Sequence, residues 1–236
     1  MFKETFSKET FVCGDMVQPY RFHKPENYTE GKEYPLVLFL HAAGERGDDN
    51  EAQLAIGLGP ALSDPESPLH ECFIVCPQCP VDKQWVDTPW DKGSYSTDDI
   101  PETVYLATAH KLREKITEEY PINKKKIFAM GISMGSYGTW DSLVRHSDVF
   151  AGGFACCGAG DPSKADRLKD MKIFAYHGSL DGVVPPQGSR DMYAAVKAAG
   201  GENISFKEYP ELYHSSWDAA YSEFADIKEL FTAEKK

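Results

Sequence analysis

The sequence has no uninterrupted apolar stretch near the roughly 18 residues that a membrane-spanning helix needs. Its opening segment, MFKETFSKETFVCGDM, is charged and has no apolar core of signal-peptide length. Positive charge is also scarce, because 25 Lys and Arg face 37 Asp and Glu, a net charge of −12 at pH 7. Nucleic acids and anionic membranes would repel such a surface, which argues against both as partners. We therefore expect a soluble, cytoplasmic protein that acts on small molecules; the oligomeric state cannot be predicted.

The sequence lacks the four-ligand grouping typical of a zinc centre. Cys76 and Cys79 have zinc-like or redox-like spacing, but the only other close pair, Cys156 and Cys157, is adjacent and cannot readily chelate. We expect reduced, structural cysteines, as in intracellular proteins, with no metal and no cofactor. The six cysteines are Cys13, Cys72, Cys76, Cys79, Cys156 and Cys157.

Internal repeats, low-complexity tracts and dividing linkers are missing too, so we expect residues 1–236 to form one domain. Short β-branched and aromatic runs alternate with helical stretches, the pattern of a mostly parallel α/β sheet covered on both faces. The predicted strands are Thr5–Val12 and Val17–His23 as an antiparallel opening, then Leu36–Leu40, Phe73–Val75, Lys126–Met130, Val149–Cys156, Lys172–Tyr176 and Ile204–Tyr209. The predicted helices are Asp49–Leu58, Ile100–Tyr120, Gly135–His146, Gln187–Ala199 and Ser216–Phe231. Only the short connection Gly158–Asp170 separates two late strands, which leaves no room there for a large helical lid.

The strongest chemical signal is the G-x-S-x-G motif centred on Ser133, which follows the strand KIFAM and opens a helix. In such an elbow the serine hydroxyl is pushed out of a strained turn, and the flanking glycines avoid clashes. The amide of Met134, at the start of the helix, can stabilise an oxyanion. A Gly-Ser-Gly turn without chemistry is the alternative, but the strand and helix around it favour a nucleophile.

A nucleophilic serine needs a base and a group that orients the base. Asp181 follows the strand KIFAY in the glycine-flanked turn HGSLDGVVP, and His214 is the only histidine after it. The order Ser133, Asp181, His214 is typical of one class of serine hydrolases and differs from the orders of two other well-known classes. An aspartate in a turn can also cap a helix, and a lone histidine can simply pack. We interpret His177, at a strand end nearby, as structural.

In their order along the chain, LFLHAAGERGDDN, CPQCP, QWVD, GISMGSYGTW, HGSLDGVVP and YHSSW resemble the α/β-hydrolase superfamily. More narrowly, they resemble its compact esterase branch, which includes carboxylesterases, feruloyl-type esterases and predicted peptidases related to prolyl oligopeptidase. The resemblance runs from about Tyr34 to the C-terminus. It implies a catalytic triad of Ser133, Asp181 and His214. It also implies an oxyanion hole built from the amides of Ala43 and Met134, although His41-Ala42 stands where the family usually has His-Gly.

The resemblance also suggests substrate contacts. Related enzymes often line their pockets with aromatic groups from the loop that holds Trp85, which points to Gln78 and Trp85, with packing of the loop as the alternative. The expected activity is hydrolysis of small, phenolic or carbohydrate-linked carboxylic esters. A small serine peptidase would share every catalytic residue, and a non-catalytic binding module is a third possibility.

Overall fold

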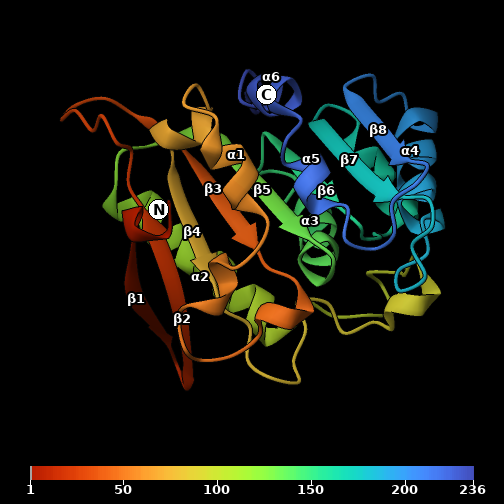
Figure 1. Cartoon of the computed structure of the whole chain (residues 1–236), viewed down its shortest axis with the longest axis horizontal. Helices are drawn as coiled ribbons and strands as arrows, with labels where there is room; N and C mark the ends of the chain where they lie inside the picture. The colour runs from red at the N-terminus through yellow and green to blue at the C-terminus, as the bar shows by residue number, and fades with distance from the viewer. Residues whose placement is uncertain (1) are drawn as a thin grey trace.

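The computed structural model describes residues 2–236, which are built on one eight-stranded sheet (Figure 1). The strand order is β1-β2-β4-β3-β5-β6-β7-β8. The pairs β1/β2 and β2/β4 are antiparallel, and every other pair is parallel. The mostly parallel sheet and its antiparallel opening are therefore confirmed. The strands are β1 (Phe6–Cys13), β2 (Met16–His23), β3 (Tyr34–Leu40), β4 (Phe73–Pro77), β5 (Ile122–Ile132), β6 (Gly152–Cys156), β7 (Lys172–Gly178) and β8 (Ile204–Tyr209).

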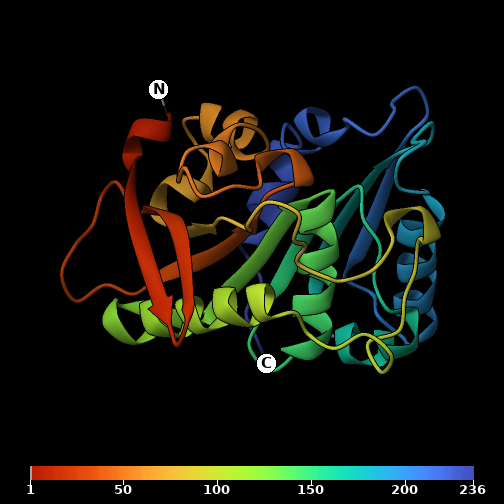
Figure 2. The same ribbon diagram turned by 90° about the horizontal axis from the view of Figure 1, so that it is seen from below.

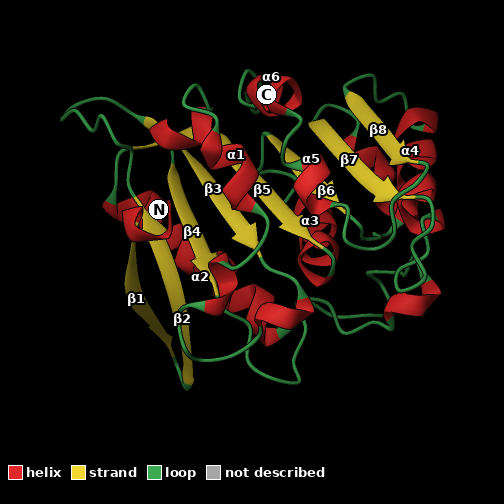
Figure 3. Cartoon of the chain, in the orientation of Figure 1, coloured by secondary structure: helices red, strands yellow, loops and turns green. Residues whose placement is uncertain are grey.

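Helices cover both faces of this sheet, as Figures 2 and 3 show. One face packs against α2 (Val104–Glu119), α3 (Met134–Arg145) and α4 (Gln187–Ala198). The other packs against α1 (Leu58–Ser63), α5 (Trp217–Ala220) and α6 (Phe224–Leu230). Each face therefore has its own apolar core, and this is why strand β3 is apolar along almost its whole length.

The cysteines follow the same division. All six are free thiols, and Cys76 packs into the core under α1 while Cys79 packs into the core under α2 and α3. The two cysteines of the C-x-x-C sequence therefore lie in different cores, and their thiols do not form a chelating pair.

The predicted helix Asp49–Leu58 is wrong. One carboxylate oxygen of Asp49 accepts hydrogen bonds from the amides of Glu51 and Ala52, at 2.9 and 3.1 Å, and this local turn competes with helix formation. Asn50 has a φ of 54°, which also interrupts a helix. Only the short 3-10 helix Ala52–Leu54 forms here, and α1 begins at Leu58, where the prediction ended.

Two other helices differ in their bounds. Helix α2 begins at Val104 rather than Ile100, because the Thr103 hydroxyl accepts from the Leu106 amide and caps it. The predicted helix Ser216–Phe231 is two helices, α5 and α6. They are separated at Tyr221, whose ring packs against Phe154 with centroids 4.7 Å apart, and at the non-helical Glu223.

The connection between β6 and β7 contains the 3-10 helix Pro162–Leu168 but no α-helix in the described chain, in agreement with the absence of a large lid there. Among residues 2–236, no helix combines the length and apolar character needed to cross a bilayer. The carboxyl ends of the parallel strands β3, β5, β6, β7 and β8 meet at one edge of the sheet. In sheets of this type, ligands bind at that edge.

Candidate active site

Ser133 lies between β5 and α3, in the sharp turn that its motif predicts. Its backbone has φ 52° and ψ −121°, a conformation that is costly for a residue with a side chain. The Ser133 amide donates to the carbonyl oxygen of Cys156, at 2.8 Å, which ties the turn to the end of β6. The rest of the fold thus holds the serine in a strained position at the carboxyl end of β5.

The two glycines of the motif are required by close backbone approaches. A Cβ atom on Gly131 would overlap the carbonyl group of Gly135 and the hydroxyl of Thr139. A Cβ atom on Gly135 would overlap the carbonyl oxygens of Leu40 and His41. The second contact brings the start of α3 against the loop that follows β3, so the two segments predicted to carry the oxyanion amides are neighbours.

We expect Gly135→Ala to lower the free energy of unfolding by about 1–3 kcal/mol, because the new methyl group can fit only if the backbone of β3 or α3 moves. Gly44→Ala is the matched control, since nothing lies within 4 Å of a Cβ atom at Gly44. It should change stability by less than about 0.5 kcal/mol. Urea denaturation of both variants measures the difference, and equal stabilities would contradict the packing described here.

The structure brings together the three side chains predicted to act as a triad. Ser133 Oγ lies 2.8 Å from His214 Nε2, and His214 Nδ1 lies 2.6 Å from Asp181 Oδ2. Each residue follows a different strand, β5, β7 or β8, so the parallel topology joins positions that lie 81 and 33 residues apart in the chain. Since a carboxylate can only accept, Nδ1 donates to Asp181, and Nε2 is left to accept from the serine hydroxyl.

The charges in this chain of hydrogen bonds are coupled. Burial raises the pKa of Asp181, but hydrogen bonds from His177, His214, Val184 and Val183 outweigh it and bring the pKa of this carboxyl below its ordinary 3.8. Burial lowers the pKa of His214, but the hydrogen bond and charge of Asp181 bring the pKa of the imidazole above 6.5. Asp181 therefore stays ionised through the neutral range and makes His214 a better proton acceptor.

His177, which the sequence analysis interpreted as structural, contacts the Asp181 carboxylate directly. Its Nε2 atom lies 3.0 Å from Asp181 Oδ2 and 3.1 Å from the carbonyl oxygen of Val184. Both partners are acceptors, so this nitrogen carries a proton and donates to the carboxylate. The other ring nitrogen is 2.8 Å from Ser189 Oγ. His177 thus fixes the orientation of Asp181 from the buried side. The sequence feature that could have indicated this contact is the position of His177 at a strand end, four residues before Asp181.

The backbone of His214 is supported by a contact that the sequence did not reveal. Cys157, at a φ of 59° just after β6, places its sulfur 3.1 Å from the His214 carbonyl oxygen and 2.8 Å from Ser216 Oγ. The Ser216 amide donates to the same carbonyl oxygen, at 2.8 Å. Burial raises the pKa of the Cys157 thiol, but hydrogen bonds with Cys156 and Ser216 and the nearby His177 lower it below 9.0. Cys157, Asp181 and His214 also present potential metal-ligand atoms within 4.8 Å of one another.

The loop after β3 is held by a buried histidine. His41 Nε2 accepts from the Cys79 amide at 2.9 Å, so Nδ1 carries the proton and donates to the Ala42 carbonyl at 2.6 Å. Burial lowers the pKa of His41 to about 4, which keeps the ring neutral in this role. The loop then turns into the 3-10 helix Ala43–Glu45, so Ala43 and Met134 are each the first residue of a helical segment. Amides at such positions have no partner within their helix.

Gln78 and Trp85, predicted as substrate contacts, lie inside the protein. Both side chains are fully buried. Gln78 donates to the Glu45 carbonyl and the Asp49 carboxylate and accepts from the Asn50 amide, while Trp85 donates to the His41 carbonyl at 3.1 Å. Because their polar atoms are used inside the protein, they shape the loop of residues 41–50 rather than contact a substrate. The packing alternative explains both residues.

A solvent-facing depression of about 500 Å³ borders the site instead. Arg46, from the loop after β3, forms one side of it, and Val183, from the Asp181 turn, forms another. Trp90 lines the depression too, with its ring 5.9 Å from the Arg46 guanidinium, and its carbonyl accepts from the Tyr137 hydroxyl of α3. Neither Trp90 nor Arg46 was singled out from the sequence.

Comparison with known proteins agrees with this architecture. Residues 27–232 match the family model described as phospholipase/carboxylesterase. A thermostable esterase is similar over 98% of this chain, with 31% identity and a TM-score of 0.86, and the chain spans 64% of the length of that esterase. A ferulic acid esterase from the anaerobic fungus Anaeromyces mucronatus shares the fold at 19% identity, with a TM-score of 0.67 and coverages of 96% and 90%.

The fold is shared with peptidases as well. Dipeptidyl peptidase 4 of Porphyromonas gingivalis matches 97% of this chain with a TM-score of 0.70 at 15% identity, although the match covers 35% of that enzyme. The sheet order, the elbow after β5 and the family match thus agree with the resemblance drawn from the motifs. The chain belongs to the phospholipase/carboxylesterase family and has the α/β-hydrolase fold.

Proposed function

We propose that this protein is a serine carboxylesterase that cleaves its substrate through an acyl-enzyme on Ser133. The observation that carries the proposal is the pair of hydrogen bonds that links Ser133 to His214, at 2.8 Å, and His214 to Asp181, at 2.6 Å. The nucleophile, the base and the group that orients the base are then already in reactive positions. Membership in a carboxylesterase-type hydrolase family supports the same reaction.

In the first half of the reaction, His214 Nε2 takes the proton of Ser133 as the serine oxygen attacks the ester carbonyl. The amides of Ala43 and Met134 would donate to the oxyanion that forms, a contribution that typically changes the rate by about 10²–10³ per donor. The imidazolium, stabilised by ionised Asp181, then gives its proton to the departing alcohol. In the second half, His214 deprotonates water, which releases the acid and restores the serine.

The surroundings of the site favour small or aromatic esters. The depression beside it is open to solvent and contains the Trp90 ring, a flat apolar surface that suits a phenolic or sugar ring. The likeness to ferulic acid esterases points in the same direction. The similar peptidases are far longer than this chain, and a small serine peptidase is the competing proposal.

We expect a fluorophosphonate probe to label Ser133 in the folded protein, and p-nitrophenyl acetate and butyrate to be hydrolysed much faster than matched amide substrates. A panel that includes feruloyl and acetylated-sugar esters would identify the preferred acid and alcohol. Absence of labelling in folded protein would favour a binding module, and faster amide hydrolysis would favour the peptidase.

A further inference from the structure

A second group of ligand-type side chains lies away from the triad, between α2 and α3. Glu102 precedes α2, His110 lies within α2, and His146 ends α3. Each offers one potential ligand atom, and the three atoms lie within 4.8 Å of one another. None of the three residues contributes to the proposed esterase reaction.

The distances suit a single metal ion. Glu102 Oε1 is 2.9 Å from His146 Nε2 and 3.6 Å from His110 Nε2. In a tetrahedral zinc site with bonds of about 2.0–2.1 Å, neighbouring ligand atoms are separated by about 3.3 Å. The two imidazole rings lie side by side, with centroids 3.9 Å apart. Both Nε2 atoms therefore face the same carboxylate oxygen, as two ligands of one ion would.

The buried histidine is suited to act as a ligand. His110 is only 2% exposed, so its ring is held in one place by the side chains packed around it. Its ring nitrogen Nδ1 is buried and has no hydrogen-bond partner among residues 2–236. The Ser142 hydroxyl donates to the Gly138 carbonyl, at 2.6 Å, so His110 Nε2 carries the proton and donates to Ser142 Oγ, at 3.1 Å. An ion that binds Nε2 displaces this proton.

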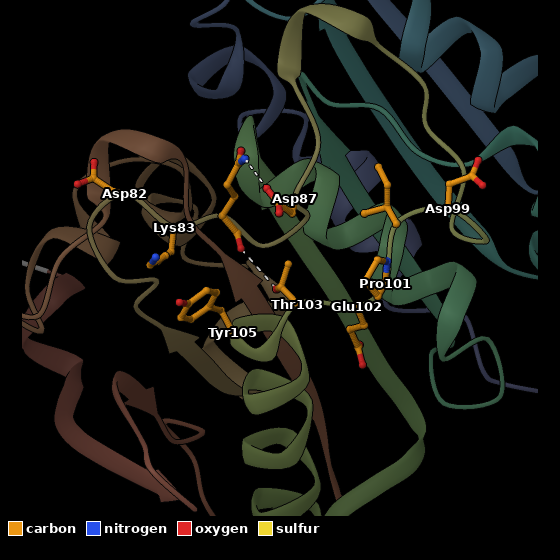
Figure 4. Close-up of a pocket in the computed structure, with 10 residues that line it drawn as sticks. Asp82, Lys83, Asp87, Asp99, Pro101, Glu102, Thr103 and Tyr105 are labelled. Atoms are coloured by element: carbon orange, nitrogen blue, oxygen red, sulfur yellow. Dashed lines mark hydrogen bonds between the residues drawn. The ribbon is translucent and has the colours of Figure 1, made fainter.

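Solvent can reach the cluster from one side. The side chains of Glu102 and His146 are 24% and 26% exposed. Glu102 also lines a depression of about 540 Å³, together with Asp99, Pro101 and Thr103 (Figure 4). An ion has an entry path through this depression, and a water molecule from it can complete the coordination. Ser142 Oγ, 3.1 Å from His110 Nε2, is a further oxygen close to the cluster.

We propose that Glu102, His110 and His146 form a binding site for one Zn²⁺ ion, held by two imidazole nitrogens and one carboxylate oxygen. Such a mixed nitrogen and oxygen set is suited to zinc rather than to calcium or magnesium, which prefer oxygen ligands alone. The ion joins the segment before α2 to the end of α3. Helix α3 has 12 residues, so the site lies about 18 Å along the helix from the Ser133 end. The ion therefore stabilises the fold without touching the reacting groups.

The test uses the full chain, stripped of metal with a chelator and titrated with Zn²⁺ by calorimetry. We expect one ion to bind and to raise the Tm, with esterase activity unchanged. Glu102→Gln and His146→Gln should each weaken this binding by at least about tenfold. His70→Gln is the matched control, because His70 also pairs with a glutamate, Glu26, at 2.8 Å but belongs to no group of three potential ligands among residues 2–236. Its zinc affinity should equal that of the unaltered protein.

X-ray absorption at the zinc edge separates this site from the potential ligands beside the triad, because only the latter include a sulfur atom, that of Cys157. Nitrogen and oxygen neighbours alone are the expected result. A sulfur neighbour, zinc affinity unchanged in both Glu102→Gln and His146→Gln, or no binding by the unaltered protein at millimolar Zn²⁺ would each overturn the proposal. Circular dichroism of the metal-free variants checks that they are folded.

Discussion

We expect Ser133→Ala and His214→Ala each to lower kcat for p-nitrophenyl butyrate by about 10⁴–10⁶, while the Tm stays nearly unchanged. Without the hydroxyl no acyl-enzyme can form, and without the imidazole nothing accepts the serine proton over the 2.8 Å hydrogen bond. Because the two residues act as one unit, the double variant should lose little beyond either single variant. Steady-state kinetics on the three proteins measures both effects.

Ser222→Ala serves as a matched control, since it removes an exposed hydroxyl that donates to the Asp218 carbonyl. It should retain the full rate. A rate like that of the unaltered protein in Ser133→Ala or His214→Ala would refute the catalytic assignment. A double variant with losses that multiply would instead show that the two residues act independently.

The proximity of Ser133, Asp181 and His214 could be predicted, because the chain encodes it through order and topology. Ser133 lies in a short motif between a buried strand and a helix, and such a turn has few possible conformations. Asp181 and His214 follow later parallel strands. Since the carboxyl ends of parallel strands share one edge, their order along the chain was enough to expect them close together.

Side-chain direction in loops was not predictable in the same way. Gln78 and Trp85 lie on a loop near the site, and nothing in their local sequence states whether they face solvent or protein. Their direction is set by partners distant in the chain, such as the Asn50 amide and the His41 carbonyl. The helix predicted over Asp49–Leu58 failed for a related reason, because the Asp49 carboxylate bonds to nearby amides and also to Gln78.

The cluster of Glu102, His110 and His146 could not be predicted either, because the local sequence of a helix does not show which other helix it contacts. His110 was placed correctly within a predicted helix, whereas Glu102 and His146, predicted inside helices, lie just outside α2 and α3. Which faces of these helices meet depends on how both pack on the sheet. Only the packed structure shows that two histidines 36 residues apart have rings 3.9 Å from each other.

Asp181→Asn should lower kcat by about 10⁴, the size of effect that the equivalent exchange has in other serine hydrolases with such a triad. The carboxylate accepts four hydrogen bonds, from His214 Nδ1, His177 Nε2 and the amides of Val183 and Val184. The amide oxygen of asparagine can keep the two backbone bonds, which places its NH₂ group toward the imidazoles. That group can only donate, so His214 must accept at Nδ1 and carry its proton on Nε2, where it can no longer take the serine proton.

The pH dependence of kcat/KM distinguishes this loss of orientation from simple misfolding. In the unaltered protein His214 must be neutral to act as a base, and its pKa lies above 6.5, so activity should rise with pH through an inflection above 6.5. Asp181→Asn removes the negative charge that favours the imidazolium, so the inflection of its residual activity should move to lower pH. Asp166→Asn, which alters an exposed carboxylate, should leave both the rate and the inflection in place. An unshifted inflection in Asp181→Asn would mean that Asp181 does not act on the charge of His214, and the residue would then contribute to folding alone.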